Sequence, residues 1–130
     1  MIKDRTKALS LAASWWAAKV KDGSSDAGDP MINLLTMFVA NKYEVSDEQL
    51  RKFALGLYDL LDEGLKEEGD ITYLDVDYHP NDILQKAIDS AGIPECKLPL
   101  KTTMRVERKN EGYNVEVSNG YGQPYITLKI

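Results

Sequence analysis

Three side chains that could do chemistry lie close together near the middle of the chain. Asp75, Asp77 and His79 occupy alternate positions, and His79 is the only histidine. If this segment is an extended strand, all three side chains lie on one face, a few ångströms apart. Two carboxylates and an imidazole could then hold a divalent metal ion, or a carboxylate could orient the imidazole for general-base catalysis. The same pattern also arises freely on a solvated strand face, and no second histidine supports a metal site.

Other signatures of catalysis are missing from the sequence. It contains no G-x-S-x-G, C-x-x-C or H-E-x-x-H motif, and Cys96 is the only cysteine. A lone cysteine can form neither an internal disulfide nor a zinc ligand set, which fits a reducing compartment. We therefore expect a non-enzymatic protein without a cofactor. A metal-dependent hydrolase centred on Asp75, Asp77 and His79 is the less favoured alternative.

The acidic residues are concentrated in one part of the chain. The net charge is −5, but between Glu44 and Asp82 there are twelve acidic residues against three basic ones, so this part carries −9 and the rest +4. A surface this negative repels phosphates and favours a basic protein surface. Acidic helix faces are also common features that keep proteins in solution. The predicted partner-binding residues are Asp59, Asp62, Glu63, Glu67, Glu68, Asp70, Asp75 and Asp77.

Length and composition indicate one ordered domain. The 130 residues include 43% hydrophobic and 28% charged residues, values typical of globular domains. No apolar run reaches the roughly 20 residues that a membrane-spanning helix needs, and the chain starts with charged residues. We expect a cytoplasmic protein without membrane contact.

Residues 1–69 have the patterns of a three-helix cluster. Apolar residues recur at helical spacing over residues 4–21, and Trp15 and Trp16 point about 100° apart, so at least one should anchor the core while the other is partly exposed or forms an aromatic platform. Residues 31–41 predict a second helix, with Asp29 and Pro30 at its start. The capping-box sequence from Ser46 to Gln49 predicts a third helix that ends near Gly69.

Residues 70–130 predict a strand, a short helix and an antiparallel three-stranded meander. The strand runs from Ile71 to Tyr78, with Thr72, Leu74, Val76 and Tyr78 on one face, and the helix starts at Pro80 and ends at Gly92. Turns are expected at residues 109–112 and 119–124, and Ile126, Leu128 and Ile130 should supply the third inward face. The fold class is therefore α+β, with the sheet packed on the helices.

The chain resembles small acidic accessory proteins of bacteriophages and mobile elements. The resemblance lies in its size, its acidity, its lack of catalytic motifs, and the tail segments Lys101-Thr102-Thr103-Met104-Arg105-Val106 and Gly120-Tyr121-Gly122. It implies a counter-defence inhibitor of the anti-CRISPR kind, in the bacterial host cytosol. Such a protein would occupy the basic nucleic-acid channel of an effector nuclease by imitating phosphates, without binding nucleic acid itself. A small-ligand or nucleotide-binding module that uses aromatic side chains and Lys101 or Arg105 is the alternative, and a homodimer is kept as a further partner.

Overall fold

The computed structural model describes residues 1–22, 44–67, 70–120 and 123–129. Their order is α1 (Arg5–Asp22), α3 (Asp47–Glu67), β1 (Ile71–Val76), α4 (Asp82–Ala91), the 3₁₀ helix η1 (Glu95–Lys97), β2 (Thr102–Lys109), β3 (Gly112–Ser118) and β4 (Ile126–Thr127). The helix predicted over residues 31–41, the cap at Asp29 and the inward Ile130 lie outside the described residues. In the described ranges, no helix has the length and apolar character needed to span a bilayer.

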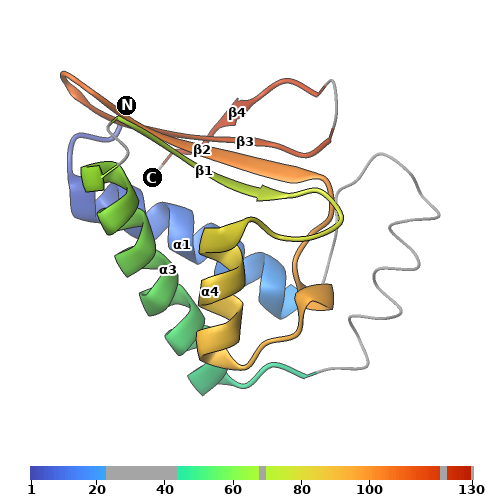
Figure 1. Cartoon of the computed structure of the whole chain (residues 1–130). Coiled ribbons are helices and arrows are strands. Elements are labelled where there is room, and N and C mark those ends of the chain that lie inside the picture. The colour runs from blue at the N-terminus through green and yellow to red at the C-terminus, as the bar shows by residue number, and fades with distance from the viewer. Residues whose placement is uncertain (23–43, 68–69, 121–122, 130) are drawn as a thin grey trace.

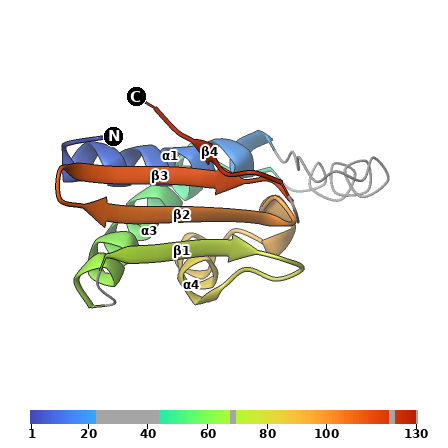
Figure 2. The same ribbon diagram turned by 90° about the horizontal axis from the view of Figure 1, so that it is seen from above.

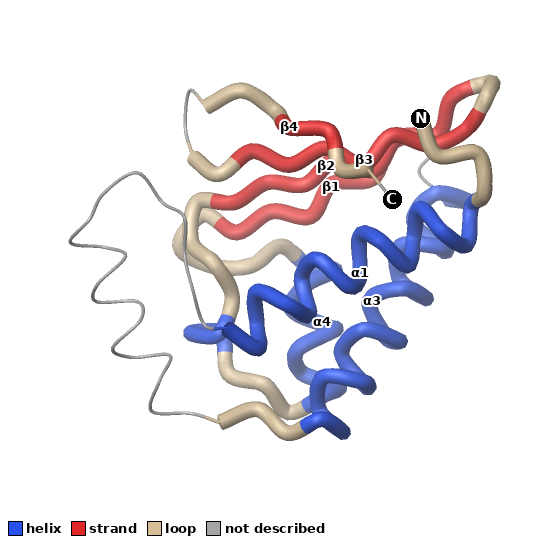
Figure 3. Tube along the Cα trace, turned by 180° about the vertical axis from the view of Figure 1, so that it is seen from behind, coloured by secondary structure: helices blue, strands red, loops and turns tan. Residues whose placement is uncertain are grey.

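The four strands form one antiparallel sheet in the order β1-β2-β3-β4. Helices α1, α3 and α4 all lie against the same face of this sheet, and the opposite face is open (Figures 1 and 2). Helix α1 contacts β3, whereas α3 and α4 contact β1, and α1 packs along α3 beneath the sheet (Figure 3). The predicted α+β class, with a sheet packed on the helices, is confirmed.

The core lies between the helices and the inner face of the sheet. Trp16 on α1 is completely buried, and its indole Nε1–H lies 3.3 Å from the Sδ atom of Met104 on β2. Trp15 is half-buried and meets Trp16 edge to face, with ring centroids 5.1 Å apart. The prediction that at least one tryptophan anchors the core is confirmed.

The start of α3 is the predicted capping box. The Gln49 amide donates to the Ser46 hydroxyl at 3.1 Å, and the Ser46 amide donates to the Gln49 side-chain oxygen at 3.0 Å. The Gln49 side-chain nitrogen also donates to the Gly92 carbonyl oxygen at 3.0 Å. This residue therefore both caps α3 and ties it to the end of α4.

The junction between β1 and α4 differs from the prediction. Strand β1 ends at Val76 rather than Tyr78, and α4 begins at Asp82, with Asn81 rather than Pro80 at its start. The chain folds back because Pro80 pairs with Val76 and the Asn81 amide donates to the Asp75 carbonyl oxygen at 2.8 Å. Tyr78 is consequently 65% exposed instead of inward-facing.

The outer edge of β3 is shared by both ends of the chain. Ile2 pairs with Tyr113 through backbone hydrogen bonds of 2.9 and 2.7 Å, and β4 pairs with Glu116 and Val117. Ile126 on β4 is 57% exposed, so the prediction that it faces inward is wrong. Only two residues of β4 pair with β3, so this strand is too short to supply a full inward row, although Leu128 does pack against the core.

Candidate partner-binding surfaces

The predicted acidic residues are divided between two surfaces. Asp59, Asp62 and Glu63 lie on α3, beneath the sheet, whereas the Asp75 side chain lies on the open face because alternate residues of β1 face the helices. The sheet therefore separates these two groups, as the arrangement in Figure 1 makes clear. Glu68 and the side chain of Glu67 lie outside the described residues. The acidic segment of the sequence is thus not one continuous patch in the described part of the chain.

Asp62 is held in an internal ion pair. Its Oδ1 atom lies 2.7 Å from Nη2 and 2.9 Å from Nε of Arg5, and its Oδ2 atom lies 3.3 Å from Lys66 Nζ. Arg5 also donates to the Asp62 carbonyl oxygen and, at 3.4 Å, to the Tyr113 hydroxyl. One arginine therefore links α1, α3 and β3, and the Asp62 carboxylate is engaged in contacts within the protein.

The Arg5–Asp62 pair predicts a specific loss of stability in acid. The hydrogen bond from Arg5, and more weakly that from Lys66, holds the pKa of Asp62 below its ordinary 3.8. Unfolded Asp62 binds protons more readily than folded Asp62, so the stabilisation is complete above pH 3.8 and is lost as pH falls through the folded pKa. In urea unfolding curves, the native chain should have a higher free energy of unfolding than Asp62→Asn. This difference should shrink below pH 3.8. A difference that stays constant between pH 6 and pH 2 would contradict this assignment.

Asp70 is also paired, whereas Asp59 and Glu63 are not. The Asp70 Oδ1 atom lies 3.1 and 2.9 Å from Nε and Nη2 of Arg108, next to a 2.6 Å backbone hydrogen bond between the same residues. Both Asp59 and Glu63 are exposed, and within the described residues neither side chain has a hydrogen bond or an ion pair. Of the predicted carboxylates on α3 whose side chains the structure describes, these two are unpaired.

Asp75, Asp77 and His79 do not form the shared face that alternation predicted. The Asp75 Oδ1 atom accepts a 2.8 Å hydrogen bond from Thr103, while His79 Nδ1 lies 3.0 Å from the Glu95 carboxylate on η1. The chain bends after Val76, and this bend removes His79 from the strand. In the described ranges, no group of three or more His, Cys, Asp or Glu side chains is placed to hold a metal ion.

The open face of the sheet carries aromatic residues that the sequence did not single out. Tyr73 and Tyr125 are 46% and 40% exposed, and Tyr73 pairs in register with Arg105, which in turn pairs with Glu116. The alternation of residues along the two strands places Tyr73 and Arg105 on the outer face, and this pattern could have identified them from the sequence. Tyr125 could not be assigned because its position depends on the path after β3.

Arg105 is held in place on this open face. Its Nη2 atom donates to Glu116 at 2.5 Å, and its guanidinium carbon lies 4.5 Å from the centre of the Tyr125 ring. The bond to Glu116, and more weakly the Tyr73 hydroxyl, raises the pKa of Arg105 against the opposing effect of burial. The guanidinium is thus held by a carboxylate and a tyrosine ring, although its buried Nε atom has no hydrogen-bond acceptor among the described residues.

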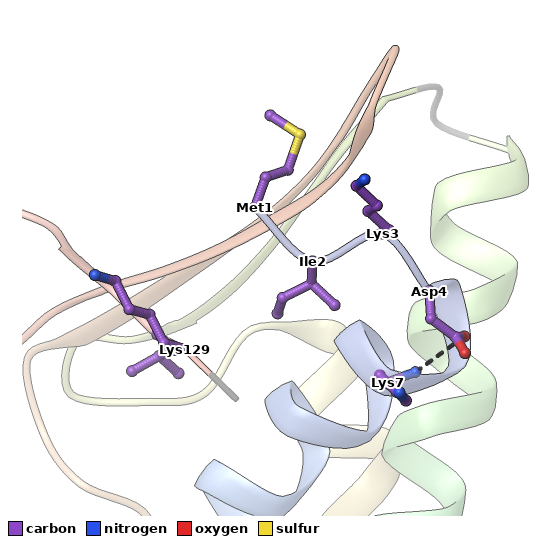
Figure 4. Close-up of a pocket in the computed structure, with 7 residues that line it drawn as sticks. Met1, Ile2, Lys3, Asp4, Lys7 and Lys129 are labelled. Atoms are coloured by element: carbon purple, nitrogen blue, oxygen red, sulfur yellow. Dashed lines mark hydrogen bonds between the residues drawn. The ribbon is translucent and has the colours of Figure 1, made fainter.

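Two hollows lie near these surfaces. One, of about 420 Å³, is lined by Tyr73, Asn81, Asp82 and Ile83, between β1 and α4. The other, of about 430 Å³, lies where the two chain ends meet and is lined by Met1, Ile2, Lys3, Asp4, Lys7, Leu128 and Lys129. The side-chain amines of Lys3, Lys7 and Lys129 point away from one another in Figure 4, so they do not converge on an anion.

Comparison of the chain with protein-family models, curated proteins and solved structures finds no match. The function must therefore be inferred from the two surfaces and the sequence. The α3 surface provides unpaired carboxylates, and the sheet face provides exposed tyrosines beside further carboxylates.

Proposed function

We propose that this chain is a non-enzymatic module that binds a protein with a basic surface. The observation that carries the proposal is a stripe along α3, formed by Leu55, Asp59 and Glu63, which we call the α3 stripe. These residues are four positions apart and therefore share one helix face. Leu55 is 55% exposed, and the two carboxylates are exposed without partners among the described residues.

The composition of the α3 stripe suits a protein partner. A single exposed leucine is ordinary on a protein surface, so the feature of the α3 stripe that suits a partner is its two unpaired carboxylates. Two like charges at this spacing destabilise an isolated helix by a few tenths of a kcal/mol, which a partner cation would relieve. A basic surface fits this combination, and a nucleic acid backbone does not.

The partner class that we propose is a nucleic-acid-binding effector of bacterial defence, such as a CRISPR nuclease. Its support is the sequence resemblance to phage accessory proteins together with the net charge of −5. Effector nucleases hold their nucleic acids in a positively charged channel. Carboxylates that approach such a channel would compete with phosphates for the same arginine and lysine side chains.

The open sheet face favours a second candidate, a small-ligand or nucleotide-binding module. Tyr73 and Tyr125 lie beside Arg105, an arrangement that could stack on a base. However, Arg105 is already bonded to Glu116, and Asp75 lies on the same face. Nearby carboxylates repel phosphates, so we prefer the protein partner.

The proposal is tested by reversing the charges of the α3 stripe. Purified guide-loaded CRISPR effector nucleases are assayed for DNA cleavage with increasing amounts of the native chain, Asp59→Lys/Glu63→Lys, or the control Glu44→Lys/Glu111→Lys. The control changes the net charge equally at two exposed positions elsewhere. We expect at least one nuclease to be inhibited, and the α3 variant to need at least about 30-fold more protein because each of the two lost ion pairs costs on the order of 1–2 kcal/mol.

The outcomes separate the two parts of the proposal. If no nuclease in the panel is inhibited, the effector assignment is wrong. Equal inhibition by the α3 variant and the control would remove the α3 stripe as the binding surface. Inhibition should also weaken as salt is raised, because exposed charges are screened.

A further inference from the structure

We propose that Asn119 is a site of spontaneous deamidation, in which the side-chain amide is hydrolysed to a carboxylate, and that this modification loosens β4. Asn119 follows β3 directly and precedes Gly120, and this is the single Asn-Gly pair in the sequence. The site lies on the connection between β3 and β4, in the sheet layer, whereas α3 lies in the helix layer (Figure 1). The inference therefore goes beyond the proposed function and does not depend on it.

The reaction needs only the two residues and water. The Gly120 backbone nitrogen loses its proton to the solvent and attacks the side-chain carbonyl carbon of Asn119. A carbon–nitrogen bond forms, the bond to the side-chain nitrogen breaks, and ammonia leaves, so that a succinimide ring joins the two residues. Water then adds to either ring carbonyl and breaks one ring carbon–nitrogen bond. The product at position 119 is an aspartyl or an isoaspartyl linkage.

The fold leaves the two reacting groups unrestrained. Strand β3 ends at Ser118, so Asn119 and Gly120 lie outside its pairing with β2 and β4. Both residues are half-buried, and within the described residues neither the Asn119 side chain nor the Gly120 backbone nitrogen has a hydrogen bond. Gly120 has no side chain to hinder the approach of its nitrogen to the Asn119 carbonyl. The attack therefore breaks no hydrogen bond of the described structure.

The other asparagines of the described ranges lack this combination. The Asn81 side chain donates to the Tyr73 carbonyl oxygen at 2.8 Å and accepts from the Leu84 amide at 3.3 Å. Asn114 lies within β3 and is followed by a buried, β-branched valine. Asn110 is exposed in the hairpin turn, but the next residue is a glutamate, whose side chain hinders the attack. Asn119 is therefore the reactive position among them.

The modification should act on β4 because few bonds hold that strand. Strand β4 pairs with two residues of β3, and the Leu128 amide adds a 2.8 Å hydrogen bond to the Val115 carbonyl oxygen. The connection before it is held at the Ser118 hydroxyl, which lies 3.1 Å from the carbonyl oxygens of Gly120 and Gln123. An isoaspartyl linkage lengthens the main chain between these groups by one methylene. Segments with so few bonds open at low free-energy cost, so we expect β4 to detach more often.

The first test compares the native chain with the peptide acetyl-Glu-Val-Ser-Asn-Gly-Tyr-Gly-Gln-Pro-amide, which has the sequence of residues 116–124. Both are incubated at 37 °C and mildly alkaline pH, and tryptic fragments are followed by mass spectrometry. We expect the native chain to gain the mass difference between OH and NH₂ at Asn119, at a rate within several-fold of that of the peptide. A peptide that reacts while the native chain stays unmodified would overturn the inference, because the fold would then protect Asn119.

A substitution at Gly120 tests the mechanism without disturbing the fold. An added Cβ would lie 3.5 Å from Gln123 Cγ, an ordinary contact, and the Gly120 backbone is outside the left-handed region. Gly120→Ala should therefore keep the native unfolding temperature but slow the deamidation of Asn119 several-fold, since the methyl group hinders the attack. The control Asn110→Gln should leave the rate at Asn119 unchanged. Equal rates in Gly120→Ala and the native chain would overturn the assignment of Gly120 as the nucleophile.

The effect on β4 is measured on the modified protein, which anion exchange separates through its additional negative charge. Hydrogen exchange should be faster at the Leu128 amide than in the native chain, and unchanged at the amide of Leu61, which is buried on α3. Unchanged exchange at Leu128 would show that deamidation does not loosen β4 and would overturn that half of the inference.

Discussion

Replacing Trp16 by alanine should lower the free energy of unfolding by about 3–5 kcal/mol, as expected for a large aromatic side chain removed from a packed core. Trp16 has no exposed surface and contacts Met104 across the interface between α1 and the sheet. A loss of this size is a large part of the 5–15 kcal/mol that is typical of folded domains. Urea unfolding followed by circular dichroism measures it directly.

The adjacent tryptophan provides the control. Trp15 is half-buried and packs its ring beside Lys19 at 5.3 Å, so Trp15→Ala should cost roughly 1 kcal/mol, near the centre of the range for single substitutions. Equal losses in the two variants would show that the buried and half-buried assignments are wrong. The comparison also separates the core role of Trp16 from the aromatic platform that the sequence left open.

Replacing Gly112 by alanine should destabilise the fold by at least about 2 kcal/mol, through overpacking and an unfavourable backbone conformation. Gly112 begins β3 with φ at +154°, and an added Cβ would lie 2.5 Å from the carbonyl oxygen of Ile2. That oxygen accepts the hydrogen bond from the Tyr113 amide. Because the obstacle is backbone, the clash can be relieved only by moving the N-terminal segment off β3.

A helical glycine provides the comparison for Gly112. At Gly56 on α3, an added Cβ would meet the Ser90 hydroxyl at 3.3 Å, and this side chain can rotate away. Alanine is favoured over glycine in a helix by about 1 kcal/mol, so Gly56→Ala should be neutral or stabilising. Thermal unfolding of both variants should rank Gly112→Ala clearly below Gly56→Ala, and the reverse order would contradict the close contact with Ile2.

The sequence by itself determined the features that depend on neighbouring residues. The capping box at Ser46, the helix that follows it and the strand alternation at Thr72, Leu74 and Val76 all appear as predicted. Each depends on side chains a few positions apart, whose spacing matches the helical or strand repeat. The α+β class follows from the order of these elements.

Local sequence patterns did not predict the boundary between β1 and α4, because more than one residue there suits the start of a helix. Pro80 suits a helix start, but Asn81 takes that role because it also satisfies the carbonyl oxygens of Tyr73 and Asp75. The strand therefore ends two residues earlier than alternation suggested, and His79 leaves the line of Asp75. The face that Asp75, Asp77 and His79 would have shared, on which the less favoured metal hypothesis depended, does not form because of this backbone pairing.

Only the tertiary structure decided which charges remain available to a partner. The sequence counts every carboxylate alike, but Asp62 meets Arg5 across 57 positions and Asp70 meets Arg108 across 38. These contacts depend on how α1, α3 and the sheet are placed, which no local repeat encodes. Among the described residues the fold leaves Asp59, Glu63 and Asp82 exposed and unpaired, so it selects which carboxylates of the acidic segment stay available.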